Sequence, residues 1–251
     1  MTSLEGRRVL VTGANRGIGA ELVRAALARG AGTVLAGVRE PAAYAPADRV
    51  VPVRLDMSAP DQISAAAADH PEVDLIVSNA GVSCYRPVLA EGGEEEFARA
   101  MEVNYLGPMR LIRAYADSVR RPDAGVVFVV SVGAVALSRS SPIYSASKAA
   151  CLMMALAVRE ELRESGAHVT VVLPGFVDTE ISASLQMPKA RAADVADRVL
   201  DGWSAGERTV WPDRFAEVVR ANVGPDFERL LEDPRAVMTG IQAAFLQSVQ
   251  G

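Results

Sequence analysis

The chain has 251 residues, half of them apolar, which is enough for one α/β domain with a large core. Its net charge of −5 argues against a nucleic-acid-binding protein, which would carry a basic stripe. Cys84 and Cys151 cannot form a disulfide framework and fit a reducing compartment, while His70 and His168 lie too far apart to predict a metal site. No signal-peptide pattern or bilayer-length apolar run is apparent, so we expect a cytoplasmic protein without a membrane partner.

Short apolar runs alternate with helical patterns, which predicts a parallel sheet covered by helices on both faces. The expected strands cover residues 9–12, 33–38, 50–55, 74–78, 126–130, 169–173 and 209–211. The expected helices run from the glycine-rich turn to residue 28 and over 59–69, 94–119 and 142–165, followed by short helices and a helical tail over 213–251. We therefore predict one domain over residues 1–251, a doubly wound, Rossmann-like parallel sheet.

A glycine-rich turn, T-G-A-N-R-G-I-G at residues 12–19, follows the first strand and opens a helix. Glycines permit the tight turn and let the backbone approach a pyrophosphate, while the helix N-terminus supplies free N–H groups. The spacing G-x-x-x-G-x-G differs from the usual G-x-G-x-x-G of dinucleotide-binding folds. A glycine-rich turn that binds no phosphate is the alternative interpretation.

The choice between NAD and NADP is expected about 20 residues after this turn, where an acid selects NAD and a basic residue binds the 2′-phosphate of NADP. Arg39 takes this position, and Arg16 in the glycine turn could approach the phosphate from its other side. Glu40 beside Arg39 complicates this interpretation, and plain surface arginines are the alternative. We favour NADP(H) as the cofactor.

A serine, a tyrosine and a lysine lie within residues 131–148. If Pro142 opens a helix, Tyr144 and Lys148 lie one turn apart on the same face. An ammonium group there favours the phenolate form of the tyrosine, and a hydroxyl such as Ser131 can share a substrate oxygen with it. Only two of the 26 basic residues are lysines, and arginine cannot replace a compact ammonium that relays a proton. We predict proton transfer to or from an alcohol or carbonyl oxygen, although Y-x-x-x-K alone is common on solvated helices.

Six candidate residues fall at the carboxyl ends of the predicted strands, the edge at which open α/β sheets bind ligands: Gly13, Arg39, Asp56, Asn79, Ser131 and Pro174. With them, the chain resembles the short-chain dehydrogenase/reductase family in its short single-domain form, over roughly residues 7–180. The matches follow the family's order and are T-G-A-N-R-G-I-G at 12–19, Asp56, N-A-G at 79–81, Asn104, Ser131, Y-S-A-S-K at 144–148 and P-G-F-V-D-T at 174–179.

The resemblance implies catalytic roles for four residues. Tyr144 would be the general acid–base, and Lys148 would support its ionisation and bind the nicotinamide ribose. Ser131 would hold the substrate oxygen, and Asn104 would keep a water that relays protons to Lys148. From the sequence alone, Asn104 is equally well interpreted as an ordinary helix residue.

The resemblance also implies a set of cofactor-binding residues. Asp56 would contact adenine, Asn79 would brace the sheet and the cofactor, and Val177 and Thr179 would meet the nicotinamide carboxamide. The full predicted set is Gly13, Asn15, Arg16, Gly17, Ile18, Gly19, Arg39, Asp56, Met57, Asn79, Ala80, Gly81, Tyr144, Lys148, Pro174, Gly175, Val177 and Thr179.

We therefore predict an NADP(H)-dependent oxidoreductase that moves a hydride between nicotinamide and a carbonyl or alcohol carbon of a small molecule. The candidate substrate-pocket walls are mostly apolar, which favours an apolar ketone or aldehyde, and they are Cys84, Tyr85, Val132, Ala134, Phe176 and Met187. The alternatives are an NAD-dependent alcohol dehydrogenase, a cofactor-binding regulator without turnover, and a nucleotide-sugar epimerase or dehydratase. Relatives of the last kind generally carry a longer substrate domain.

An apolar run without polar side chains, residues 149–158, follows Lys148, and this is more than a helix on one sheet face needs. Together with Leu106, Met109, Leu111 and Ile112 it predicts pairing of two chains, so we expect a homodimer or a homotetramer. A strand and glycine-rich turn often join the family's tetramers, but here a helical tail replaces them, which favours the dimer. Tail helices folding back over the same face are the competing explanation.

Overall fold

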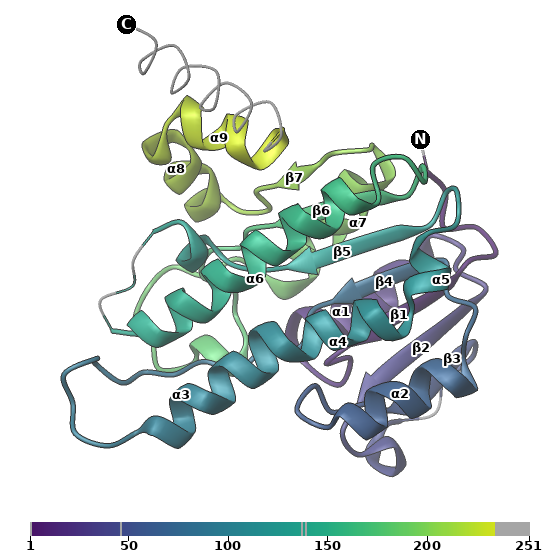
Figure 1. Cartoon of the computed structure of the whole chain (residues 1–251), viewed down its shortest axis with the longest axis horizontal. Coiled ribbons are helices and arrows are strands. Elements are labelled where there is room, and N and C mark those ends of the chain that lie inside the picture. The colour runs from purple at the N-terminus through teal and green to yellow at the C-terminus, as the bar shows by residue number, and fades with distance from the viewer. Residues whose placement is uncertain (1, 46, 137, 139, 234–251) are drawn as a thin grey trace, which may run out of the picture.

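One parallel sheet forms the centre of the molecule (Figure 1). The computed structural model describes residues 2–45, 47–136, 138 and 140–233. Within them the strand order is β3-β2-β1-β4-β5-β6-β7, with every pair parallel. The strands are β1 (Arg8–Thr12), β2 (Thr33–Val38), β3 (Val50–Arg54), β4 (Leu75–Ser78), β5 (Gly125–Val129), β6 (His168–Val172) and β7 (Thr209–Val210). The predicted doubly wound α/β fold is confirmed.

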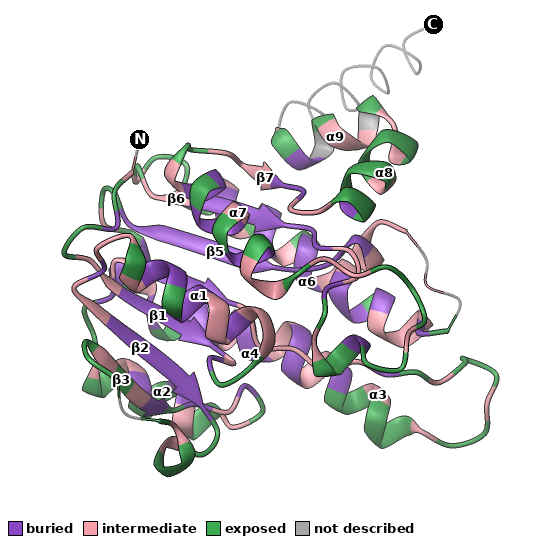
Figure 2. Cartoon of the chain, turned by 180° about the vertical axis from the view of Figure 1, so that it is seen from behind, coloured by how far each residue is buried: buried purple, intermediate pink, exposed green. Residues whose placement is uncertain are grey.

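Two layers of helices cover the sheet, one on each face (Figures 1 and 2). One face carries α1 (Gly17–Ala28) and α7 (Ala192–Ser204). The other carries α2 (Pro60–Asp69), α4 (Gly107–Ala114), α5 (Ala116–Val119) and α6 (Pro142–Glu161). Single turns of 3₁₀ helix occur at Pro41–Ala43, Val132–Ala134 and Glu180–Ser182.

The strands are apolar along their length because both of their faces are buried. Successive side chains of a strand point to opposite faces of the sheet. Leu10 and Phe128 therefore belong to the core under α2, α4 and α6, whereas Val9 and Val127 belong to the core under α1 and α7. Figure 2 shows β5 buried over its whole length.

The predicted helix over residues 94–119 is helical over nearly its whole length, but it is not one regular α-helix. It consists of α3 (Glu94–Met101), a π-helical turn at Glu102–Leu106, then α4 and α5. Pro108 supplies the physical reason, because it has no N–H to donate to the carbonyl of Asn104 four residues earlier. The interruption places Asn104 inside the π-helical turn, where regular i→i−4 bonding is lost.

The part of the predicted helical tail that the structure describes is helical, as α8 (Arg214–Val223) and α9 (Pro225–Glu232), and residues 234–251 lie outside the described residues. The buried Arg159 of α6 secures α9 by donating to the carbonyl of Leu231, and its Nε donates to Val169 O at 3.2 Å. Burial, helped by the nearby Arg208, lowers the pKa of Arg159 to about 10. These tail helices therefore pack at the C-terminal end of α6.

The surface proposed for chain pairing is smaller than the sequence predicted. Leu111 and Ile112 are buried in the core, so they offer nothing to a second chain. In α6, Leu152 and Leu156 are buried in the same core, and Met153 is the large apolar side chain that stays exposed. The fully apolar run is explained by the two layers that α6 packs between, the sheet and the neighbouring helices.

Candidate active site

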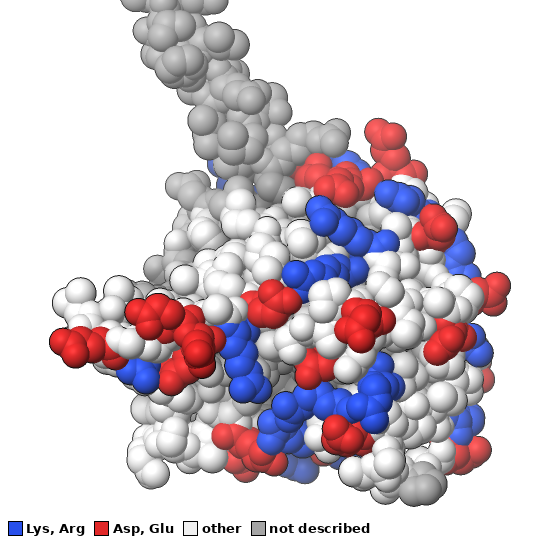
Figure 3. Space-filling model, turned by 60° about the horizontal axis from the view of Figure 1, so that its bottom comes forward, with Lys and Arg blue, Asp and Glu red and all other residues white. Residues whose placement is uncertain are grey.

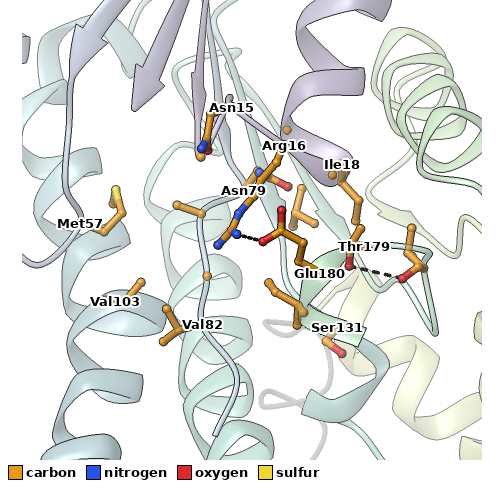
Figure 4. A pocket seen from close by; sticks show the side chains of 18 of the residues that line it. Asn15, Arg16, Ile18, Met57, Asn79, Val82, Val103, Ser131, Thr179 and Glu180 are labelled. Atoms are coloured by element: carbon orange, nitrogen blue, oxygen red, sulfur yellow. Dashed lines mark hydrogen bonds and ion pairs between the residues drawn. The ribbon is translucent and has the colours of Figure 1, made fainter. Parts of the chain in front are cut away.

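A pocket of about 360 Å³ lies at the carboxyl ends of the strands, where the glycine turn, the ends of β2 to β6 and the start of α6 meet. Every residue of the predicted cofactor-binding set lines this pocket. Figure 4 shows part of its wall, with Met57 and Val103 on one side and Thr179 on the other. The structure thus brings together residues that are separated by up to 166 positions in the sequence, from Gly13 to Thr179.

The glycine turn is held against the end of β4. Thr12 Oγ accepts the N–H groups of Asn79 and Ala80, each at 2.9 Å, and the Asn79 amide donates to Thr12 O at 2.9 Å. Gly13 has a φ of +67°, which favours glycine. A Cβ on Gly19 would lie 2.1 Å from the carbonyl oxygen of Gly13, so only glycine lets α1 approach the strand this closely.

The N-terminus of α1 opens into the pocket without a local partner. Gly17, Ile18 and Gly19 line the pocket, and α1 has neither a side-chain cap nor an acidic residue in its first turn. Its first N–H groups and its partial positive charge therefore face the cavity. Arg16, at the N-cap, forms an ion pair with Glu180 across the pocket (Figure 4). The predicted contact of Arg16 with a phosphate stays a prediction.

Two arginines and an aspartate gather where β2, β3 and α3 meet. Arg39, Asp56 and Arg99 line this end of the pocket, and among the described residues neither arginine has an ion-pair partner within 4 Å. Burial alone would raise the pKa of Asp56, but hydrogen bonds from the N–H and hydroxyl of Ser58, with the charges of Arg39 and Arg99, lower it. Asp56 is therefore ionised at neutral pH.

The charge around α3 is divided. Glu94, Glu95 and Glu96 occupy its first turn, and Figure 3 shows acidic side chains gathered on the part of the molecule that projects there. Arg99, one turn further on, lines the pocket instead. Because Arg99 lies inside a helix and not at a strand end, the rule that located the other pocket residues did not indicate it.

Tyr144 and Lys148 lie one turn apart on α6, which begins at Pro142 as predicted. Lys148 Nζ lies 5.8 Å from the centre of the Tyr144 ring and donates to Val129 O at 3.2 Å. The lysine is 4% exposed. Ser131 follows β5 and its Oγ accepts the N–H of Gly133 at 3.0 Å, so its hydroxyl proton is left to donate elsewhere. The pocket is lined by Tyr144, Lys148, Ser131 and Val129.

Asn104 is buried behind the pocket wall and does not line the cavity. Its Oδ1 accepts the N–H of Val82 at 2.9 Å, and its Nδ2 donates to Val82 O and to Ser147 Oγ, both at 2.9 Å. Ser147 Oγ in turn donates to Tyr144 O at 2.8 Å. The side chain therefore links the strand-end segment after Gly81 to the helix that carries Tyr144.

The predicted substrate residues do not line the pocket. Cys84 and Val132 are buried, and Phe176 stacks on Phe215 of α8, with ring centres 4.6 Å apart. Tyr85 contacts a residue of the pocket, because its hydroxyl donates to Ile181 O at 2.7 Å. Burial and the nearby Tyr144 raise the pKa of Tyr85. Ala134 is half-buried, and Met187 is exposed beyond the pocket.

Further pocket residues were not predicted from the sequence. They are Gly37, Val38, Leu55, Ser58, Val82, Arg99, Val103, Val129, Val130, Glu180, Ile181 and Ser182. Most of them adjoin a predicted residue, so a prediction that included the neighbours of each strand-end residue would have found them.

Among the described helices none is long and apolar enough to cross a bilayer. Within the same residues, no three His, Cys, Asp or Glu side chains form a group that could hold a metal ion.

Comparison with known proteins supports what the geometry indicates. The family model for short chain dehydrogenases matches residues 7–190. A "Fatty acyl-CoA reductase Rv0547c" of Mycobacterium tuberculosis is 31% identical over 255 residues, covering 92% of this chain and 85% of that protein. The "Dehydrogenase/reductase SDR family member 7B" of Mus musculus is 34% identical over 193 residues, covering 70% of this chain but only 59% of the mouse protein.

A solved structure is similar as well. The short chain dehydrogenase from Burkholderia cenocepacia J2315, in complex with NADP, superposes with a TM-score of 0.84 at 35% identity, over 91% of this chain and 97% of that one. Fold and pocket thus define a Rossmann-like α/β protein. The chain belongs to the short-chain dehydrogenase family of oxidoreductases, and the similarity supports a nicotinamide cofactor.

Proposed function

We propose that this protein is an NADP(H)-dependent oxidoreductase that interconverts a carbonyl compound and its alcohol. One observation carries the proposal: Ser131, Tyr144 and Lys148 line the same pocket as the glycine turn. Groups that move a proton and groups suited to a dinucleotide phosphate therefore face one cavity. When bound, the reduced nicotinamide would supply the hydride.

The pocket fits a dinucleotide at its phosphate end. The uncapped N-terminus of α1 offers N–H donors to a pyrophosphate, and Gly13 and Gly19 leave the backbone accessible. Deeper in the pocket, Gly81 has little space for a side chain. A Cβ there would lie 3.2 Å from Asn104 Oδ1 and 3.3 Å from Lys148 Nζ. Gly13, Gly17, Ile18 and Gly19 would thus hold the phosphates.

The preference for NADP(H) rests on Arg39 and Arg99. Two guanidinium groups line this end of the pocket, no carboxylate of the described residues forms an ion pair with either within 4 Å, and together they favour an additional phosphate at the adenosine end. Glu40, the residue that complicated this interpretation, points its carboxylate to Arg54 at 3.9 Å. Asp56, whose Oδ1 is already bonded to Ser58, would be left to accept from the adenine amino group.

Proton transfer is assigned to Tyr144. In the reducing direction its hydroxyl would donate a proton to the substrate oxygen while the Ser131 hydroxyl donates a hydrogen bond to the same oxygen. The ammonium group of Lys148, held by Val129 O, would stabilise the phenolate that remains. Asn104 would keep α6 in register with the wall of the pocket through Val82 and Ser147.

We propose an apolar ketone or aldehyde as the substrate. Val82, Val103 and Ile181 contribute apolar walls to the pocket, and Tyr85 fixes the backbone of Ile181. The Mycobacterium tuberculosis relative is named a fatty acyl-CoA reductase, so a long acyl thioester is the second candidate substrate. Both candidates share an apolar chain attached to a reducible carbonyl.

The test is a screen of NADPH and NADH oxidation by the purified full-length chain. The panel contains aliphatic and aromatic ketones, aldehydes and a long-chain acyl-CoA, and cofactor binding is measured separately by titration. We expect turnover of an apolar carbonyl with NADPH. Tight NADPH binding without turnover of any panel member would instead favour a cofactor-binding regulator, and turnover with NADH alone would refute the proposed cofactor.

A further inference from the structure

Asp213 connects the C-terminal helices to the wall of the pocket. It is the N-cap of α8, where its Oδ1 accepts the N–H of Ala216 at 2.9 Å. Its Oδ2 accepts the N–H of Gly175 at 2.7 Å. Gly175 lines the pocket, whereas Asp213 does not. One carboxylate therefore caps α8 and also accepts a hydrogen bond from the pocket wall.

The peptide group between Pro174 and Gly175 is held from both sides. Its N–H donates to Asp213, and its carbonyl, that of Pro174, accepts the N–H of Val132 at 3.0 Å. A peptide group is planar, so two opposed hydrogen bonds fix its rotation. Because Val132 follows Ser131 directly, this single peptide links the end of β5, the turn after β6 and the start of α8.

The turn after β6 packs so closely against the start of α8 that there is no space for a side chain at Gly175. A Cβ on Gly175 would lie 2.7 Å from Asp213 Oδ1 and 2.9 Å from Cδ1 of Phe215. The ring of Phe176 packs on Phe215 with centroids 4.6 Å apart. The start of α8 thus packs directly against the part of the wall that leads to Val177 and Thr179.

We propose that Asp213 is a positioning residue for the cofactor: it fixes the Pro174–Gly175 peptide, and with it the pocket wall between Ser131 and Val177. The inference rests on the proposed function, because it assigns this wall to nicotinamide binding. A carboxylate suits the position because both of its oxygens accept from N–H donors. An asparagine would turn an NH₂ group toward one of these donors.

The decisive variant is Asp213→Ser. Serine caps helices about as well as aspartate, so α8 keeps its cap while Gly175 loses its acceptor. We expect a modest fall in the melting temperature of the cofactor-free protein, because one hydrogen bond is lost, and a rise of about 10-fold or more in the dissociation constant for NADPH. Glu217→Gln, which removes a charge from the first turn of α8, is the control and should bind NADPH like the wild type.

Hydrogen–deuterium exchange supplies a readout that needs no bound cofactor. Peptides covering residues 174–179 should exchange faster in Asp213→Ser, while those covering β1 stay unchanged. Wild-type NADPH affinity in Asp213→Ser would overturn the positioning role, and so would wild-type exchange at residues 174–179. If the serine variant does not fold, Asp213→Asn decides, since wild-type NADPH affinity in that variant would overturn the role as well. Failure of the wild-type chain to bind either nicotinamide cofactor would contradict the proposed function itself.

Discussion

Lys148 reaches back along α6 so that its Nζ lies 5.8 Å from the Tyr144 ring centre, and it is anchored there by Val129 O at 3.2 Å. The anchor comes from the last residue of β5, two positions before Ser131. One strand end therefore positions both the lysine and the serine relative to the tyrosine. Under the proposed mechanism, Tyr144 and Ser131 would act on one substrate oxygen while Lys148 stabilises the phenolate, and this arrangement is what places them to do so.

Replacing Tyr144 with phenylalanine should remove the proton donor and preserve the pocket. We expect the rate to fall by about 10² to 10⁴, the usual contribution of general acid–base catalysis, with NADPH affinity close to that of the wild type. Steady-state kinetics and a cofactor titration on the same preparation measure both quantities. Wild-type turnover by the variant would remove Tyr144 from the mechanism.

Lys148→Arg should impair the enzyme although it keeps the positive charge. The side chain is buried beside Gly81, and a planar guanidinium cannot occupy the place of a compact ammonium that donates to Val129 O. We expect kcat/KM to fall about 100-fold, the effect of a displacement near 1 Å in a reacting group. Lys189→Arg, at the other lysine of the chain, is the matched control; equal activity of the two variants would contradict this role.

The fold and the residues that line the pocket could be predicted from the sequence because both follow from local rules. Glycine spacing identified the turn at Gly13, and the carboxyl-end rule placed Asp56, Asn79 and Pro174 at one edge. Each of these residues is positioned by backbone that leaves a strand. The positions of these residues in the sequence therefore predict that they lie together in the folded protein.

Residues positioned by tertiary packing escaped the prediction. Arg99 reaches the pocket from within α3, and Phe176 turns away from it because Phe215 of α8 offers a ring to stack on. Asp213 was assigned only to the start of a tail, since nothing local marks its bond to Gly175 across 38 positions. The break after α3 was predictable from Pro108, but the apolar periodicity on both sides concealed it.

Cofactor choice should respond to Arg39. Arg39→Asp places a negative charge beside the expected 2′-phosphate, so NADPH binding should weaken at least about 10-fold while NADH binding changes little or improves. Arg54→Asp makes the same charge change at a residue that does not line the pocket, which separates a local contact from the overall field. An NADPH/NADH affinity ratio equal to that of the wild type would make Arg39 a plain surface residue.

Tyr115 should give the protein an alkaline stability limit. Burial, with Asp69 nearby, raises the pKa of Tyr115 from about 10 to about 12, and its hydroxyl donates to Ala66 O at 3.0 Å. Between these pH values the folded protein keeps the proton that the unfolded chain loses. The free energy of unfolding therefore falls as pH rises through this window, by at most about 1.4 kcal/mol per pH unit.

Tyr115→Phe should remove that part of the alkaline decline. The variant should also be less stable at pH 7 by about 1–3 kcal/mol, because the buried carbonyl of Ala66 loses its donor. Urea unfolding of both proteins at pH 7, 9 and 11 provides the comparison, and contributions from Tyr44 and Tyr85 cancel in the difference. If the free energy of unfolding depends on pH in the same way in both proteins, the pKa of Tyr115 is the same in the folded and unfolded states, which contradicts the prediction.

Assembly can be tested at Met153, which is 58% exposed on the outer side of α6. Leu106 and Met109, predicted from the sequence to belong to the same surface, are half-buried. The described tail helices do not cover it, because Met153 stays exposed although they pack on α6 through Arg159 and Leu231. We therefore expect a homodimer in which α6 packs against its copy across a two-fold axis.

Met153→Glu should place a charge at the centre of that interface and convert the dimer to a monomer at micromolar concentration. Val218→Glu is the matched control, because Val218 is similarly exposed, at 53%, on α8 and away from α6. Size-exclusion chromatography with light scattering distinguishes the species for all three proteins. A wild-type chain that is monomeric under these conditions, or a Met153→Glu variant that stays dimeric, would exclude α6 as the interface.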